Sequence, residues 1–167
     1  ALYIHIPYCL SKCGYCDFNS YSGRGEEYDG YTRALFSELT RRGSALAGAS
    51  ASSIFFGGGT PTVLGAERLS SILTRCREML SVVTQPEISV EANPETISPN
   101  MLKSLLDAGF NRISIGVQSF NDGNLSLLGR THNGAQAAEA VRMAAEAGFQ
   151  NVSLDLMFGI PGQEVSR

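Results

Sequence analysis

Short apolar runs alternate with longer segments of helical periodicity along the chain. Five runs have the length and composition of buried strands, at residues 2–6, 53–56, 87–91, 112–117 and 152–157. Apolar residues recur at helical spacing in four intervening segments, namely 28–42, 66–80, one that begins at Ser98-Pro99, and 134–147. Residues 122–128 are expected to add one or two further helical turns. The pattern predicts an α/β fold.

A local repeat indicates that the strands are parallel. Residues 108–115 (AGFNRISI) recur as residues 147–154 (AGFQNVSL), an offset of 39 residues. Each copy ends a helix at a glycine and begins a strand soon afterwards. This spacing fits one strand–helix unit of a parallel sheet, which closes either as a doubly wound open sheet or as a barrel.

The two faces of the predicted strands differ in polarity. Residues i and i+2 share a face of a strand, so Ile113 and Ile115 lie on one side while Ser114 and Gly116 lie on the other. The strands at 87–91 and 152–157 alternate in the same way. Strands covered by helices on both faces are apolar nearly throughout, so this alternation favours a barrel, or part of one, with a polar interior.

Candidate chemistry follows the end of every predicted strand. In such barrels the reactive groups lie at the C-terminal ends of the strands. The segments found there are a cysteine-rich loop at 9–16, a glycine run at 57–59, Glu91, Gln118, and Asp155 with Met157. We therefore expect these segments to meet at one rim.

Composition narrows the class of protein. The 167 residues suffice for one domain, and the net charge of −3 with a pI near 5.4 argues against nucleic acid as a partner. The sequence contains neither an apolar run long enough to span a membrane nor the pattern of a signal peptide. These features predict a cytoplasmic protein, in which clustered cysteines are metal ligands more often than disulfides.

Three of the four cysteines lie within eight residues, spaced Cys9-x3-Cys13-x2-Cys16. A structural zinc site usually takes four ligands, commonly in two pairs, and the sequence offers no second pair. The fourth cysteine, Cys76, lies in the apolar stripe of its helix and is predicted to be core. Three thiolates on a cubane cluster leave one iron open. The loop therefore predicts a [4Fe–4S] cluster, with zinc as the main alternative.

This cysteine spacing resembles the cluster loop of radical S-adenosylmethionine (SAM) enzymes. Further segments resemble the anaerobic coproporphyrinogen III oxidase group of that family and its heme-chaperone (HemW-like) branch. They are 3–9 (YIHIPYC), 56–62 (FGGGTPT), 90–94 (VEANP), 116–120 (GVQSF), 128–133 (LGRTHN) and 155–162 (DLMFGIPG). The resemblance implies a partial (β/α) barrel. Residues 1–167 would be the N-terminal part of the radical SAM core domain, truncated after about five strands, with the remaining barrel and a C-terminal domain absent.

The resemblance also implies two cofactors and the residues that hold them. The open iron would bind the amino and carboxylate groups of SAM, and an electron from the cluster would cleave SAM to a 5′-deoxyadenosyl radical. The implied cluster ligands are Cys9, Cys13 and Cys16. The implied SAM contacts are Tyr15, Gly58, Gly59, Thr60, Glu91, Gln118, Arg130, Asp155 and Met157. Tyr3 would lie near a porphyrin substrate.

Particular chemistry suits several of these roles. A glycine run allows close backbone approach to the methionine amino group, and the two oxygens of Glu91 suit a ribose diol. The forked donors of Arg130 suit a carboxylate. The plainer alternatives are a tight turn for the glycines, a solvated charge for Glu91, a surface salt bridge for Arg130 and core packing for Met157. His5 is expected to be a hydrogen-bonded interior residue.

Phe18 distinguishes between the two branches of the group. The coproporphyrinogen oxidases carry an additional cysteine two positions after the third one, where this chain has Phe18. The resemblance therefore favours a heme chaperone, whose partners would be heme, an electron donor and a heme-acceptor protein. The alternatives are oxidative decarboxylation of porphyrinogen propionates and a domain with a purely structural metal. We also expect these 167 residues alone to bind SAM weakly.

Overall fold

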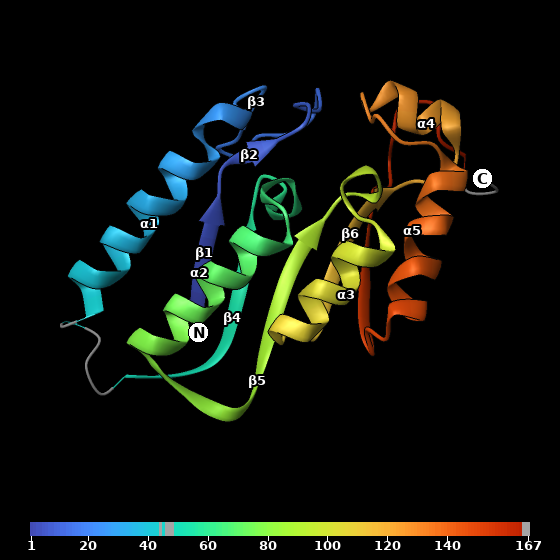
Figure 1. The fold of residues 1–167 in the computed structure, drawn as a ribbon. Helices are drawn as coiled ribbons and strands as arrows, with labels where there is room; N and C mark the ends of the chain where they lie inside the picture. The colour runs from blue at the N-terminus through green and yellow to red at the C-terminus, as the bar shows by residue number, and fades with distance from the viewer. Residues whose placement is uncertain (44, 46–48, 165–167) are drawn as a thin grey trace.

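The computed structural model of the protein describes residues 1–43, 45 and 49–164. The last residues of the predicted domain, 165–167, lie outside the described residues. A five-stranded parallel sheet runs in the order β1-β4-β5-β6-β7 (Figure 1). Its strands are β1 (Leu2–Ile6), β4 (Ser50–Gly58), β5 (Ser81–Ala92), β6 (Arg112–Gln118) and β7 (Asn151–Leu156). The prediction of a parallel α/β fold is confirmed.

Five helices accompany this sheet in the described residues. They are α1 (Tyr28–Gly43), α2 (Ala66–Met79), α3 (Pro99–Ala108), α4 (Asp122–Leu127) and α5 (Gly134–Ala147). The predicted start of α3 is confirmed, because the Ser98 hydroxyl accepts a hydrogen bond from the backbone N–H of Met101 at 3.3 Å. Gly109 and Gly148, which end the two repeated helices, both adopt the left-handed conformation expected after a helix.

Some boundaries differ from the prediction. Strands β4 and β5 begin at Ser50 and Ser81, several residues before the apolar runs, because Ser50 and Ala51 pair with Ser81 and Val82 ahead of a shift in register. Met157, predicted to close the last strand, lies just beyond β7. A two-stranded sheet of β2 (Tyr8–Cys9) and β3 (Tyr21–Ser22) was not predicted, since two-residue strands leave no periodicity.

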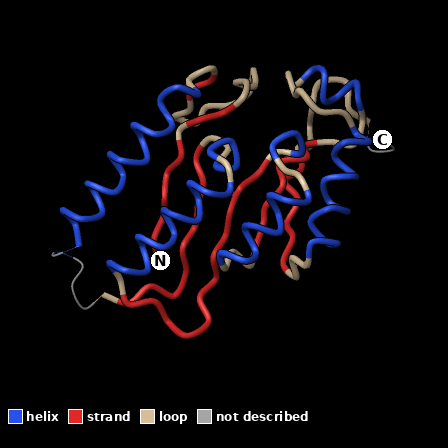
Figure 2. The backbone as a smooth tube through the Cα atoms, viewed as in Figure 1, coloured by secondary structure: helices blue, strands red, loops and turns tan. Residues whose placement is uncertain are grey.

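The helices cover one face of the sheet, as Figure 2 shows, and α1, α2, α3 and α5 contact one another in that order. The core lies between the two layers, and among its fully buried residues are Ile6, Phe56, Ile88, Val90 and Ile113. Burial of each such side chain contributes about 1.5–3 kcal/mol to stability.

The opposite face carries the polar or accessible side chains that the strand alternation predicts. Tyr3 is 56% exposed there, and Ser114 and Asp155 form a hydrogen bond across neighbouring strands. The C-terminal ends of the strands point toward the end of the molecule where β2, β3 and α4 lie (Figure 1). The layer of helices therefore supports the sheet, while the free face and its rim hold the candidate site.

Strand β7 is the last strand of the described sheet. Its apolar face is only partly covered, with Leu154 and Leu156 exposed to 36% and 57%. An exposed apolar strand at a sheet edge favours aggregation. No helix among the described residues is both long enough and apolar enough to cross a bilayer.

Candidate cofactor-binding site

A cavity of about 490 Å³ opens at the C-terminal ends of the strands. Its lining includes residues at or just after the C-terminal ends of β1, β4, β5, β6 and β7, as expected for one shared rim. It is lined by all three loop cysteines and by every residue assigned to SAM: Tyr15, Gly58, Gly59, Thr60, Glu91, Gln118, Arg130, Asp155 and Met157. Tyr3 does not line it.

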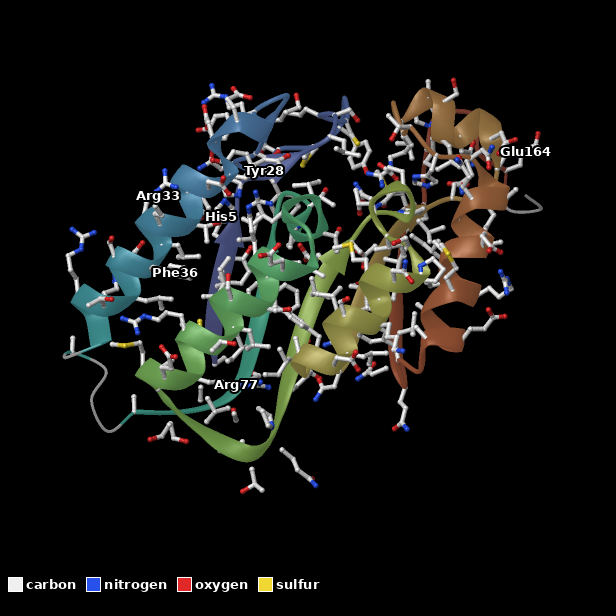
Figure 3. The ribbon with its side chains drawn as sticks, viewed as in Figure 1. His5, Tyr28, Arg33, Phe36, Arg77 and Glu164 are labelled. Atoms are coloured by element: carbon white, nitrogen blue, oxygen red, sulfur yellow. The ribbon has the colours of Figure 1, made fainter. Side chains whose placement is uncertain are left out.

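The cysteine loop is anchored to the sheet at its first residues. Gly59 donates its N–H to the carbonyl of Ile6 at 2.8 Å, and Thr60 donates its N–H to the carbonyl of Tyr8 at 2.7 Å. The buried ring of Tyr8 packs against Tyr28. Figure 3 shows Tyr28 and His5 at this end of the molecule, while Arg77 lies toward the other end. These contacts hold the start of the cysteine loop against the glycine run.

The chemistry of the loop fits an iron–sulfur cluster. Cys9, Cys13 and Cys16 are free thiols that line the same cavity. Within the described part of the chain, no group of three His, Cys, Asp or Glu side chains is placed to hold a single metal ion. A cubane makes a different demand, because separate thiolates bind separate irons of the cluster. Cys76 is fully buried in the helical layer, and burial raises its thiol pKa to about 11. Its prediction as core is confirmed.

The glycine run is required by close contacts. A Cβ atom on Gly59 would lie 2.5 Å from the carbonyl oxygen of Tyr8, a backbone atom that cannot move aside alone. Gly58 has φ +117°, and a Cβ there would collide with the ring of His5. The His5 ring in turn lies 3.1 Å from the carbonyl oxygen of Asn19, as expected for an interior hydrogen-bonded residue. The glycines thus form a tight turn that also brings backbone to the cavity wall.

Glu91 is half-buried and lines the cavity, so its carboxylate is not a fully solvated charge at the end of a strand. One of its carboxylate oxygens accepts the N–H of Gly58 at 3.1 Å. Burial raises the pKa of Glu91 and the nearby Asp155 adds to this shift, while the bond from Gly58 opposes it. The second oxygen remains available as an acceptor.

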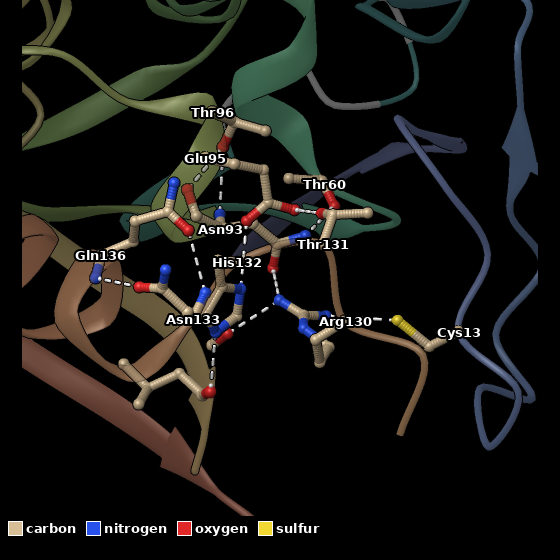
Figure 4. Close-up of polar contacts among 12 residues, drawn as sticks. Cys13, Thr60, Asn93, Glu95, Thr96, Arg130, Thr131, His132, Asn133 and Gln136 are labelled. Atoms are coloured by element: carbon tan, nitrogen blue, oxygen red, sulfur yellow. Dashed lines mark hydrogen bonds and ion pairs between the residues drawn. The ribbon is translucent and has the colours of Figure 1, made fainter. Parts of the chain in front are cut away.

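Arg130 lines the cavity, and it makes no salt bridge with any residue that the structure describes. Its Nη2 donates to the side-chain oxygen of Asn93 at 2.7 Å and to the carbonyl of Gly116 at 2.8 Å (Figure 4). Its Nη1 donates to the sulfur of Cys13 at 3.3 Å. The remaining Nε is buried without a hydrogen-bond partner. A buried, unpaired cationic donor is costly in the free protein and suits an anionic ligand.

The other assigned residues complete the rim. Gln118 has φ 63°, a strained conformation for a residue other than glycine, and such strain often marks a functional position. Its carbonyl accepts the N–H of Met157 at 2.9 Å, which holds Met157 beside the cavity. Asp155 accepts a hydrogen bond from Ser114 at 3.0 Å. Partial burial raises the pKa of Tyr15.

Tyr3 lies below the cavity on the open face of the sheet. Its ring stacks on that of Phe55, with centroids 5.8 Å apart and an interplanar angle of 13°. The structure therefore places this residue apart from the cysteines and the assigned SAM contacts.

Three residues of the site were not identified from the sequence. Asn93 joins Arg130 to Thr60, since its amide nitrogen donates to the Thr60 hydroxyl at 3.1 Å. Behind it, His132 has a fully buried side chain, with one ring nitrogen 3.2 Å from a carboxylate oxygen of Glu95 and the other 3.0 Å from the carbonyl of Val117. Burial alone would raise the pKa of Glu95, but hydrogen bonds, chiefly from His132, outweigh it and lower the pKa. The sequence indicated a role for these three residues only through their position a few residues after Glu91 or Arg130, which had already been assigned to the site.

This fold and rim define a class of protein, the partial (β/α) barrel with a three-cysteine cluster loop after its first strand. The family model of the radical SAM superfamily matches residues 3–166. The chain belongs to this family.

Curated relatives and solved structures agree with this assignment. The chain is 41% identical over 166 residues to the heme chaperone HemW of Escherichia coli (strain K12), covering 99% of this chain and 44% of that protein. It is 43% identical over 166 residues to the heme chaperone HemW of Bacillus subtilis (strain 168), covering 96% and 43%. The structure of coproporphyrinogen III oxidase (HemN) from Escherichia coli superposes with a TM-score of 0.91 at 35% identity, covering 98% of this chain and 38% of that one. The chain spans less than half the length of these proteins.

Proposed function

We propose that the protein binds a [4Fe–4S] cluster through Cys9, Cys13 and Cys16 and binds SAM in the adjoining cavity. The observation that carries this proposal is the convergence on one 490 Å³ space of three free thiols and the nine residues that the family resemblance assigns to SAM. When held by these three thiolates, the cluster would supply the single electron needed for reductive cleavage of SAM at its sulfur–C5′ bond.

The chain's own residues bind and orient SAM in this proposal. Glu91, already fixed by the Gly58 N–H, accepts from the ribose hydroxyls with its second oxygen. Arg130 offers its unpaired Nε–H to the carboxylate of SAM, and the backbone of Gly58 and Gly59 with the Thr60 hydroxyl receives the amino group. The half-buried Met157 and the exposed Tyr15 flank the adenine in this proposal.

We further propose that the whole protein acts as a heme chaperone in porphyrin metabolism. Two observations favour this function over oxidative decarboxylation. The chain is 41% identical to a heme chaperone and 35% identical to a coproporphyrinogen oxidase. In addition, Phe18 replaces the extra cysteine of the oxidases and is 67% exposed at the cavity, where it supplies no thiol. The proposed partners are heme, an electron donor and a heme-acceptor protein, in the cytoplasm.

Anaerobic reconstitution tests the cofactor proposal. We expect a count close to four irons and four sulfides per chain, and an EPR signal of the reduced cluster that changes when SAM is added. Zinc in place of iron and sulfide would contradict the proposal.

Titration with heme, alongside an assay with coproporphyrinogen III, tests the function. Saturable heme binding without decarboxylation supports a chaperone. Decarboxylated product formed with turnover of SAM would assign the protein to the oxidase branch instead.

A further inference from the structure

A chain of hydrogen bonds links two of the cysteine sulfurs across the cavity wall, and Figure 4 shows the part of it from Cys13 through Arg130 and Asn93 to Thr60. It runs from Cys13 to Arg130, then to Asn93, then to Thr60 and finally to Cys9. The contacts are 3.3 Å, 2.7 Å, 3.1 Å and 3.6 Å long in that order. Four separate segments contribute, so these hydrogen bonds form together only when the cysteine loop, the ends of β4 and β5, and the 128–133 segment are correctly placed.

The chemistry of the side chains fixes the direction of every bond. A guanidinium only donates, so the atom of Asn93 that faces Arg130 is its oxygen, and its NH₂ group must face Thr60. The Thr60 oxygen then accepts from Asn93, which leaves the hydroxyl hydrogen free to point at Cys9. Arg130 donates directly to Cys13. Both sulfurs therefore receive a hydrogen bond, and Asn93 contacts both donors.

We propose that Asn93 is a positioning residue that orients Thr60 and Arg130 as donors to Cys9 and Cys13, and that this arrangement raises the reduction potential of the cluster. The inference rests on the proposed cluster site. Hydrogen bonds to ligand sulfurs offset the negative charge that a cluster gains on reduction, and they are among the factors that set its potential.

The surroundings of Asn93 are built to hold its side chain in place. A Cβ atom on Gly116 would lie 2.8 Å from the Asn93 oxygen, so glycine leaves the room that the amide occupies. The backbone of Asn93 is fixed by a capping box with Thr96 at the short helix Pro94–Thr96. Glu95 of that helix contacts His132, which lies two residues after Arg130. Both ends of the Arg130–Asn93 contact are thus anchored together.

The test is a double-mutant cycle on the reconstituted protein without SAM, read as the cluster potential in an EPR-monitored redox titration. Thr60→Val removes the hydroxyl and keeps the shape, and we expect it to shift the reduction equilibrium about tenfold toward the oxidised cluster, which is about 59 mV for a one-electron couple. Thr60→Ser keeps the hydroxyl and should restore the wild-type potential.

The second arm of the cycle uses Asn93→Asp, which is isosteric. A carboxylate still accepts from Arg130, but it also accepts from Thr60 and so turns that hydroxyl away from Cys9. Thr60→Val should therefore cause no further shift in the Asn93→Asp background. Asn19→Asp places the same charge on an exposed position three residues after Cys16, and in this control background Thr60→Val should cause its full shift.

The outcomes separate the two proposals. A wild-type protein that holds no iron–sulfur cluster would overturn the proposed function and this inference with it. If the wild type holds the cluster, two results overturn the relay alone: Thr60→Val leaves the potential unchanged, or it causes the same shift with Asn93 and with Asn93→Asp. Iron and sulfide counts on each variant ensure that only loaded protein is compared.

Discussion

Gly59→Ala is expected to separate the cysteine loop from the end of β4. The added Cβ would lie 2.5 Å from the carbonyl oxygen of Tyr8 and 2.9 Å from its backbone carbon and nitrogen. Neither partner can relax alone, because Gly59 also bonds to Ile6 and the next residue, Thr60, bonds to Tyr8. The backbone at the root of the loop must therefore shift.

The size of the effect follows from this geometry. Overpacking of this kind costs about 1–3 kcal/mol, and loss of one of the two backbone hydrogen bonds adds about 0.5–1.5 kcal/mol. For a chain of this length each kcal/mol lowers Tm by about 2–4 °C. The shift should also move the three thiols away from their positions in the cavity. The iron content after reconstitution should therefore fall by more than the loss of folding stability alone explains.

The assay compares Gly59→Ala with Gly25→Ala by thermal unfolding, iron and sulfide content, and SAM affinity. Gly25 is the matched control, because a Cβ there meets no atom within 4 Å and its φ is not in the left-handed region. The reasoning is refuted if the two variants have the same Tm and the same cluster content.

Three further predictions concern buried ionisable groups. Glu91→Gln should stabilise the cluster-free protein at neutral pH while weakening SAM binding. Burial raises the pKa of Glu91 in the folded protein. The protonated side chain therefore contributes stability at pH values below the usual pKa of 4.5, and this contribution is lost as the pH rises through the pKa of the folded protein. Urea titrations should accordingly show that Glu91→Gln is more stable than the wild type at neutral pH and no more stable in acid. Cys76 should escape alkylation in the native protein while the three loop cysteines react, and four adducts in the mass spectrum without denaturant would contradict this. His132→Ala should lower the free energy of unfolding by about 1–3 kcal/mol, because Glu95 loses its contact with the fully buried His132 ring and keeps only the side-chain hydrogen bond from Thr131. The pKa of Glu95 is lowered, so wild-type stability from this pair should fall as the pH drops below 4.5, and an unchanged acid profile in Glu95→Gln would count against it.

Much of the fold follows from local signals in the sequence. The glycine-ended repeat predicts two helix ends and the parallel order of strands, and Ser98-Pro99 predicts the start of α3. The alternation of Ile113 and Ile115 with Ser114 and Gly116 identifies which face is covered by helices. Each of these signals is contained in a short stretch of sequence, so it can be recognised in a single sequence. The pairing of β2 with β3 leaves no such signal, because it depends on where a loop of about a dozen residues returns.

The sequence predicts where the site lies but not which of its side chains form hydrogen bonds with one another. Strand parity places Glu91 and Gln118 at one rim, because parallel strands end together. Parity says nothing about which side chains bond to one another, and so the contacts of Asn93 and His132 were missed. A buried histidine and an asparagine within a turn have the same sequence signature whether they hold a site together or fill a core.

Backbone strain and a buried polar atom without a hydrogen-bond partner are found at the rim of the sheet rather than in the layer of helices. Gln118 adopts a positive φ, Glu91 carries a raised pKa, and Nε of Arg130 is buried without a partner. Each of these features costs stability in the free protein. In the proposed complex, a diol would donate hydrogen bonds to Glu91 and a carboxylate would accept one from Arg130. The apolar core on the opposite face offsets that cost, since its packing does not depend on the cavity being filled. A ligand that satisfied these groups should therefore raise Tm more than its contact area predicts, because it removes existing penalties as well as forming new contacts.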